Sequence, residues 1–389
     1  MKKLLLLAIV LRLLVAGLLF HPDIKIYNFQ SSFLSRGILD IYSYLIENKK
    51  TLPFKEEFAY FPLTYFAIGG YQWMVSPILG NDFDSWLNNA SSGSVVKDPN
   101  IFRYLIVLKF PYLILDILIA FLLKKYFDDK KKGEKAFTLW LFNPFTIVLI
   151  YAFSNVEIFA VALTLIALLL TRQKRFLLAS GVLALSAGFK VYPVLLIPFL
   201  FLKGKDLKEK TLIILVPILT LAAIILPFWS SLFVQSALIS GWTTRIANPN
   251  FVIVTSILFF YAWIIDRKIK LFNYWFIILL FIFSFSHFHI AWLLWVAPFI
   301  VILAIKKPVL STFFLFITIL AFLIPMLYND KSMTISLFRI YSTWYDLLPT
   351  PFSVIEKFYD PVSLQTIIQS ALAGGSLVFA YKLLGRDKT

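Results

Sequence analysis

The sequence predicts an all-α, polytopic integral membrane protein with about twelve transmembrane helices. Hydrophobic side chains make up 60% of the 389 residues and charged ones only 15%, and the mean hydropathy is +0.83. Soluble domains are about a quarter charged. Several apolar runs also approach the roughly 20 residues that span the hydrocarbon core of a bilayer. A soluble enzyme, a disordered protein and a fibrous repeat are therefore excluded.

The first apolar run, residues 4–20, follows two lysines and resembles a signal peptide. It ends at His21-Pro22-Asp23, which lacks the small residues of a cleavage site, so we predict an uncleaved first helix with a cytoplasmic amino end. Arg12 inside it is expected either to snorkel or to pair within the bundle. Further spans are predicted at residues 105–123, 137–153, 158–171, 176–189, 191–203, 211–228, 250–266, 271–285, 290–305, 308–327 and 363–384.

Lysine and arginine residues cluster in alternate connections, as the positive-inside rule requires of cytoplasmic loops. Both termini are therefore expected in the cytoplasm of a multi-pass cell-membrane protein. This distribution explains the formal charge of +16 without a nucleic-acid partner. The clusters are Lys2 and Lys3; Lys124, Lys125, Lys130, Lys131, Lys132 and Lys135; Arg172, Lys174 and Arg175; Lys203, Lys205, Lys208 and Lys210; Arg267, Lys268 and Lys270; Lys306 and Lys307; Lys382, Arg386 and Lys388.

The basic clusters all lie on the cytoplasmic side of the membrane only if residues 21–104 do not cross it. The stretch 58–80 is apolar, but it contains two prolines, the pair Gly69-Gly70 and several aromatic residues. We therefore predict broken amphipathic helices at the membrane surface. The whole chain, 1–389, is expected to form one membrane-embedded catalytic domain. Its outer face is the expected functional face, because long loops more often carry function. The long outer loops are 21–104, 229–249 and 328–362.

Three acids near the predicted spans are candidate functional groups. Asp23 lies three residues after the first span, so the helix end sets its depth at the interface; it is either a functional acid or the cap of a following helix. Asp40 interrupts an apolar stripe at helical spacing and is expected to face water or headgroups. Asp116 lies inside the second span and is either functional or paired with Arg12 or a backbone group.

Glu157 begins the fourth span at its outer end. It forms a polar cluster with Ser154 and Asn155 at the outer membrane edge. Hydroxyl groups of a substrate can bind such a cluster.

Lys190 lies in a short outer turn at membrane depth, where the positive-inside tendency disfavours a basic residue. It requires an anion, and we predict a lipid phosphate, with a structural ion pair to an outer acid as the alternative. Arg245, also outer, is a second candidate phosphate ligand because its planar guanidinium suits phosphate oxygens. His287 and His289 are two residues apart, so a helix points them to different faces. Hydrogen bonds to substrate are favoured over a two-histidine metal site.

Several kinds of site are absent from the sequence. The chain has no cysteine, which excludes disulfides, thiolate metal sites and thiol nucleophiles. It also lacks the motifs of a phosphate-binding loop, a zinc protease and a serine hydrolase. We expect no metal ion and no cofactor.

An acid directly after the first span, a long first outer loop and AYFPLTYF at 59–66 resemble the membrane-embedded GT-C glycosyltransferases. The closest likeness is to the polyprenyl-phosphate-mannose-dependent mannosyltransferases. Residues 139–199 are similar to that family's order of Asn-Pro, polar outer turn, basic inner turn and Lys-x-Tyr-Pro, and 286–299 resemble its later aromatic-rich segment. The family's polar turn often reads Gly-Gln-x-Asp, where this chain has residues 154–157. Its Tyr-Pro-Pro appears here as Tyr60-Phe61-Pro62.

The resemblance implies transfer of a hexose, mannose first, from a polyprenyl-phosphate donor to a glycan, lipid or protein acceptor at the extracytoplasmic face, with inversion. Asp23 is then the general base, and Lys190 with Arg245 binds the donor phosphate. The main alternative is a flippase or transporter of lipid-linked saccharides, which predicts polar residues throughout the membrane depth. A purely structural subunit leaves Asp23 and Lys190 unexplained. The implied substrate-binding residues are Tyr27, Tyr60, Asn155, Glu157, Tyr192, His287 and His289.

Overall fold

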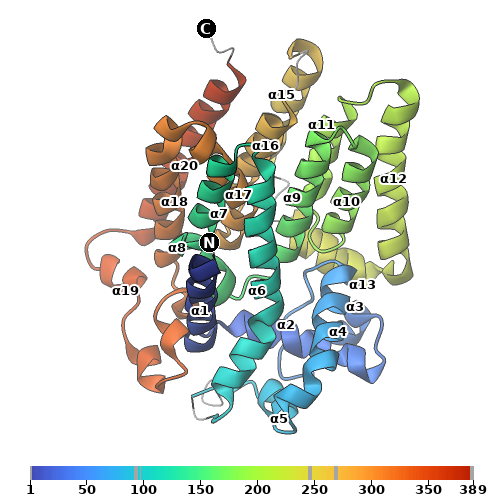
Figure 1. Ribbon diagram of the computed structural model, residues 1–389. Coiled ribbons are helices and arrows are strands. Elements are labelled where there is room, and N and C mark those ends of the chain that lie inside the picture. Colours follow the sequence, from blue (N-terminus) through green and yellow to red (C-terminus); the bar gives the residue numbers. More distant parts are fainter. Residues whose placement is uncertain (1, 92–94, 97, 244–247, 267–269, 386–389) are drawn as a thin grey trace.

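The computed structural model describes residues 2–91, 95–96, 98–243, 248–266 and 270–385. In this part of the chain every regular element is a helix, which confirms the all-α class (Figure 1). The longer helices are α1 (Lys2–Leu18), α2 (Pro22–Ser32), α4 (Pro62–Leu79), α6 (Ile101–Tyr126), α7 (Lys130–Leu141), α9 (Ile158–Arg172), α10 (Phe176–Ala187), α12 (Leu207–Ile225), α15 (Pro249–Phe260), α16 (Leu271–Phe285), α17 (Leu293–Lys306), α18 (Ser311–Met326) and α20 (Pro361–Leu384).

Shorter helices connect these or extend them. They are η1 (Phe33–Arg36), α3 (Ile41–Glu47), α5 (Phe83–Asn88), α8 (Pro144–Ile147), η3 (Val148–Ala152), η4 (Tyr192–Leu196), α11 (Ile197–Phe201), η5 (Leu226–Phe228), α13 (Ser231–Phe233), η6 (Val234–Thr243), η7 (Tyr261–Ile265), η8 (Ile290–Trp292), η9 (Pro308–Leu310), η10 (Lys331–Met333), η11 (Ile335–Phe338), η12 (Thr343–Leu347) and α19 (Pro351–Ile355).

Four helical stretches are long and apolar enough to cross a membrane: α6, α12 with η5, η9 with α18, and α20. Two bent pairs raise this number to six. One consists of α1 with α2 and η1, bent by 83°, and the other of α7 with α8 and η3, bent by 47°. Six shorter apolar helices of 10–17 residues complete the set, so a helix occupies each predicted span. Their lengths support a multi-pass helical membrane protein but do not confirm twelve full crossings.

Two central helices have no polar face. All residues of α16 from Tyr274 to Ser284 are buried, as are all residues of α17 from Leu293 to Phe299. A helix that is apolar all round is stable inside a protein core or inside a bilayer, and these two lie in the core. By contrast α12, at the edge of the bundle in Figure 1, buries only Ile213 and Pro217, so its apolar side chains face outward, where lipid replaces protein contacts.

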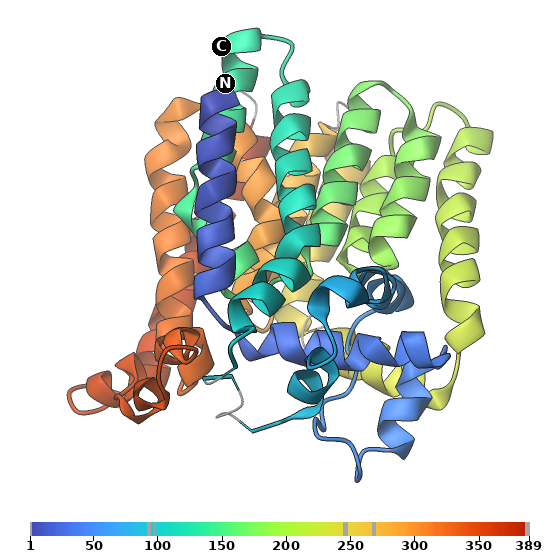
Figure 2. The same ribbon diagram turned by 60° about the horizontal axis from the view of Figure 1, so that its bottom comes forward.

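The first long connection folds at one end of the bundle. Because the chain turns by 83° after α1, α2 runs across this end instead of along the bundle (Figure 2). The prediction of broken helices over residues 58–80 is wrong, because α4 is one continuous helix from Pro62 to Leu79. A Cβ atom on Gly69 would lie 2.5 Å from the carbonyl oxygen of Ser31, so this glycine permits close packing of α4 on α2. The helix α4 is not among those apolar enough to cross.

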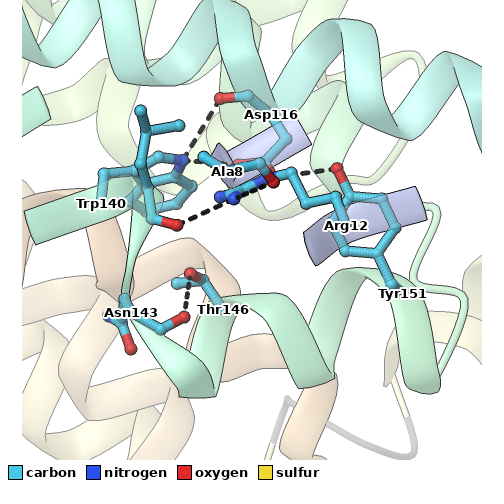
Figure 3. Close-up of polar contacts among 8 residues, drawn as sticks. Ala8, Arg12, Asp116, Trp140, Asn143, Thr146 and Tyr151 are labelled. Carbon is cyan, nitrogen blue, oxygen red and sulfur yellow. Dashed lines mark hydrogen bonds and ion pairs between the residues drawn. The ribbon is translucent and has the colours of Figure 1, made fainter. Parts of the chain in front are cut away.

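An ion pair joins α1 to α6 inside the bundle (Figure 3). Arg12 and Asp116 are both fully buried, with Nε of the arginine 2.5 Å from Oδ2 of the aspartate. Trp140 Nε1 donates to Oδ1 at 2.6 Å, and the Tyr151 hydroxyl donates to Oδ2 at 2.9 Å. Arg12 also donates to the Leu141 carbonyl at 2.8 Å. The pairing alternative for Arg12 and Asp116 is therefore confirmed, and the contact ties together α1, α6, α7 and η3.

We expect that removing one partner of this pair destabilises the protein by about 3–5 kcal/mol, because the other charge remains buried without compensation. Arg12→Met and Asp116→Leu should each lower the midpoint of thermal unfolding, followed by tryptophan fluorescence in detergent. The double variant should recover most of the loss. Lys49→Met is the control, since Lys49 is 49% exposed and lies 3.8 Å from Glu57. Single variants no less stable than this control would contradict the interpretation.

Candidate functional site

A cavity of about 160 Å³ lies where α2, the segment before α4, the start of α9, the turn after α10 and η8 meet. Six of the residues predicted to form the site line it. The complete lining is Asp23, Ile26, Tyr27, Gln30, Glu56, Glu57, Ala59, Tyr60, Glu157, Lys190, His289 and Trp292.

Asp23 reaches this cavity because of the bend after α1. Pro22 is the first residue of α2, and His21 is its N-cap, with Nδ1 accepting from the Asp23 amide at 3.3 Å. The capping role considered for Asp23 is therefore taken by His21. Asp23 lies in the first turn, where the helix dipole favours its negative charge. Its side chain is 34% exposed and therefore accessible from the cavity.

A buried lysine that the sequence analysis missed holds the end of α1. Lys109 on α6 is fully buried, and its Nζ donates to the carbonyls of Ala16 at 2.9 Å and Leu19 at 2.7 Å. These carbonyls lie at the C-terminal end of α1. Carbonyl groups there lack hydrogen-bond partners within the helix, so they attract a cation. Lys109 lies inside a predicted span and outside every cytoplasmic cluster, and this position could have marked it as a residue with a partner in the bundle. The contact sets the point from which the chain turns towards Asp23.

Lys190 is positioned by contacts between two helix ends. The Leu63 amide donates to the Gly188 carbonyl at 3.1 Å, and the Thr64 hydroxyl donates to the Phe189 carbonyl at 3.0 Å. Free amides at the start of α4 thus meet free carbonyls at the end of α10. A Cβ atom on Gly188 would lie 2.6 Å from Cδ1 of Leu63, so any larger residue here would displace the Leu63 side chain. This contact places Lys190 in the cavity wall.

The buried amine of Lys190 lies close to an acid and an aromatic ring. Its Nζ lies 3.5 Å from Oε1 of Glu157 and 4.3 Å from the centroid of the Tyr60 ring. The side chains of the ion pair are only 8% and 2% exposed. Oε2 of Glu157 accepts a hydrogen bond from Trp295 Nε1 at 2.9 Å. The structural ion pair, given above as the alternative for Lys190, is therefore present, and the same lysine also lines the cavity.

The turn before α9 holds Glu157 in place. Asn155 accepts from the Glu157 amide at 2.9 Å and donates to the Ala291 carbonyl at 3.1 Å. Asn155 does not line the cavity and shapes the turn instead. Ser154 is fully buried with a φ of 54°, a left-handed conformation that costs a non-glycine residue on the order of 1–3 kcal/mol. The strain is maintained by the surrounding packing.

Two phenols connect the acid to the amine. The Tyr27 hydroxyl donates to Oδ2 of Asp23 at 2.9 Å, and the Tyr60 hydroxyl donates to that of Tyr27 at 3.2 Å. Burial raises the pKa of both phenols well above 10, and the charge of Asp23 adds to the effect on the pKa of Tyr27. Both remain protonated donors at neutral pH. The chain of contacts continues from the Tyr60 ring to Lys190.

The other candidates lie in different surroundings. His289 lines the cavity, whereas His287 is exposed and does not. Tyr192 is fully buried behind the wall, where its ring stacks on that of Trp295 at 4.1 Å. Arg245 lies outside the described residues. The described residues contain no group of three or more His, Asp or Glu side chains arranged to hold a metal ion.

Two acids in the cavity wall were not predicted. Glu56 and Glu57 are separated from the AYFPLTYF segment by Phe58 alone, and this proximity could have pointed to them. With Asp23 and Glu157 they give the lining four carboxylates against one amine, Lys190. The potential in the cavity is therefore negative when all four are ionised, which favours a cation or a neutral sugar over a free anion.

Chemically, the cavity offers an accessible carboxylate, a buried amine and two hydroxyl donors within one small volume. This set can remove a proton from a hydroxyl group and stabilise negative charge nearby. No protein-family model, no curated protein and no solved structure matches this chain. The functional argument therefore depends on the residues themselves.

The lysine of α2, Lys25, anchors that helix outside the predicted spans. Lys25 donates from Nζ to the Asn89 carbonyl at 2.6 Å and lies 4.6 Å from the centroid of the Trp86 ring. Burial lowers the pKa of Lys25 to about 8, although the charge of Asp98 opposes the shift. Below pH 8 the Lys25 amine is protonated in both the folded and the unfolded protein. Folding then buries a charged amine, and the stability of the folded protein is lowered by the full cost of that burial.

We expect this cost to disappear as the pH rises from about 8 towards 10.5, because the folded protein loses the Lys25 proton first. The stability of the wild type should therefore increase over this range relative to Lys25→Met. Thermal unfolding in detergent at successive pH values measures the difference. Lys49→Met, which removes an exposed lysine, should show no such trend. A relative stability that falls with pH would contradict the assignment.

Proposed function

We propose that this protein is an inverting glycosyltransferase. It transfers a hexose, mannose first, from a polyprenyl-phosphate donor to a hydroxyl group of a glycan, lipid or protein acceptor. The observation that supports this function best is the single cavity shared by Asp23 and Lys190, which Tyr27 and Tyr60 connect. The order of motifs that resembles the GT-C enzymes points the same way.

In the proposed reaction Asp23 accepts the proton of the acceptor hydroxyl as its oxygen attacks the anomeric carbon. The new bond forms on the face opposite the departing phosphate, so the configuration inverts. The accessible carboxylate suits this role, since a general base must come within hydrogen-bond reach of the proton that it removes. The hydrogen bond from Tyr27 to Oδ2 orients the carboxylate.

Lys190 stabilises the charge that grows on the phosphate oxygen as the bond to the anomeric carbon breaks. Its 3.5 Å separation from Glu157 is longer than the 2.7–2.9 Å of a tight charged hydrogen bond, so the ammonium can turn to a phosphate at modest cost. Because the lining carries four carboxylates, the proposal requires a further cation for the phosphate. Arg245 is the candidate that the sequence offers.

The proposed topology has twelve crossings, both termini in the cytoplasm and the cavity at the extracytoplasmic face. Two features support it. The α6–α7 connection with its lysines lies at one end of the bundle, and α2 and α5 lie at the other (Figure 2). In this arrangement α2 to α5 are interfacial helices, and the lipid tail of the donor stays in the bilayer beside the cavity.

A flippase or transporter of lipid-linked saccharides is the alternative. It requires polar groups along the membrane depth that are available to a moving headgroup. Asp116, the main acid inside a predicted span, is instead neutralised by Arg12, and Lys109 is bound to the end of α1. These interior charges hold helices together, which favours chemistry at one face over a translocation path.

The first test follows transfer by purified protein in lipid, with radiolabelled polyprenyl-phosphate hexoses and total membrane acceptors. Asp23→Asn should reduce transfer by about 10²-fold or more while donor binding is retained, because only the base is lost. The control is Asp40→Asn. Asp40 caps α3 by accepting from the Tyr42 and Ser43 amides, and asparagine caps a helix about as well. Full transfer by Asp23→Asn would refute the assigned base.

The second test separates phosphate binding from a structural role of Lys190. Changing this lysine alone leaves Glu157 buried and unpaired, so the informative variant is the double Lys190→Met/Glu157→Gln, in which both charges are removed. We expect weaker donor binding and a lower kcat in the double variant, whereas Glu157→Gln alone keeps donor binding. Wild-type donor affinity in the double variant would contradict the proposal. Labelled lipid that crosses the bilayer unconsumed would favour the flippase.

A further inference from the structure

A second concave site lies at the other end of the bundle. The end of α6 lies at the opposite end from α2 and α5 in both views (Figures 1 and 2), and its last residue, Tyr126, lines a depression of about 310 Å³. The ends of α6 and α9 and the starts of α10 and α16 enclose this depression. Four cations surround it, and its described lining contains no carboxylate: the cations are Arg172, Lys174, Lys203 and Lys270. We call these four residues the basic rim.

An aromatic ring holds one member of the basic rim in place. The guanidinium of Arg172 lies 4.6 Å from the centroid of the Tyr126 ring, and Nη2 donates to Asp128 at 2.8 Å. Lys306 donates to the hydroxyl of the same tyrosine at 2.8 Å. Asp128 is 93% exposed and compensates the charge of Arg172 alone among the four residues of the basic rim. None of Lys174, Lys203 and Lys270 lies within ion-pair distance of a carboxylate in the described chain.

Lys174 occupies a backbone position that normally favours glycine. Its φ is 60°, and it follows the C-cap of α9. Its amide donates to the Thr171 carbonyl and that of Arg175 to the Leu170 carbonyl, both at 3.0 Å, which is the pattern of a Schellman turn. Glycine fits this turn without strain, so a lysine at this position carries a local conformational cost. Its side chain lines the depression.

The walls below the basic rim are apolar. They include Leu168, Phe176, Leu271 and Phe272. Phe176 and Leu271 are also the first residues of α10 and α16, so the positive ends of two helix dipoles face the same space. A cationic rim over apolar walls suits a ligand with an anionic head and a hydrocarbon tail. Inorganic phosphate would use only the rim.

We propose that this depression binds the phosphate headgroup of an anionic phospholipid. The lipid phosphate lies against the basic rim, and its acyl chains leave along the apolar walls into the leaflet at that end of the protein. Basic pockets between membrane helices bind the head groups of acidic lipids in this way. The site is separate from the cavity of Asp23 and independent of the glycosyltransferase proposal.

The test uses the full chain in neutral detergent and titrates short-chain phosphatidylglycerol. Native mass spectrometry measures bound lipid, and tryptophan fluorescence measures the unfolding midpoint. We expect saturable binding with a higher midpoint for phosphatidylglycerol, and neither effect for phosphatidylcholine or inorganic phosphate. Equal stabilisation by inorganic phosphate would overturn the lipid assignment in favour of a free-anion site. Equal binding of phosphatidylcholine would overturn the role of charge.

Lys174→Gly is the decisive variant, because glycine suits the left-handed turn and the variant should fold at least as well as the wild type. We expect it to weaken phosphatidylglycerol binding about fivefold, and Lys203→Ala to have a similar effect. Lys208→Ala is the matched control. This lysine is exposed on the neighbouring α12 and does not line the depression. Unchanged binding in Lys174→Gly and Lys203→Ala, or an equal loss in Lys208→Ala, would overturn the proposal.

Discussion

The buried pair of Arg12 and Asp116 is the contact on which the rest of the structure depends. Neither charge is stable in an apolar interior without the other, so α1 and α6 cannot separate without exposing a charge to hydrocarbon or to packed side chains. Trp140 and Tyr151 bring α7 and η3 to the same carboxylate. The pair thereby fixes the direction of α1, and Lys109 fixes where α1 ends.

The candidate site follows from two junctions between helix ends. The bend after α1 carries Asp23 across the end of the bundle, and the start of α4 meets the end of α10 beside Lys190. At the first junction Lys109 donates to free carbonyls at the end of α1. At the second, a free amide at the start of α4 donates to the carbonyl of Gly188. Tyr27 and Tyr60 then connect the acid and the amine, which come from segments far apart in the chain.

The two ends of the bundle differ strongly in charge. The cavity that contains Asp23 and Lys190 has four carboxylates and one amine in its wall, whereas the opposite depression has a basic rim and no carboxylate in its described lining. In a membrane this asymmetry would favour different partners on the two sides: hydroxyl-rich or neutral groups in the first site, and anionic headgroups in the second. The apolar outer surface between the two sites would contact lipid in a membrane.

The sequence by itself determined the helical class and the position of every apolar segment, because helix period and run length are local properties. It also brought out Asp23 and Lys190, since a charge near a span is costly. Only the tertiary structure decided that Glu56 lines the cavity and that Tyr192 packs behind its wall, and it showed why Gly69 does not break α4. Spacing along a helix tells which residues share a face. Which neighbour that face meets depends on contacts between segments distant in sequence.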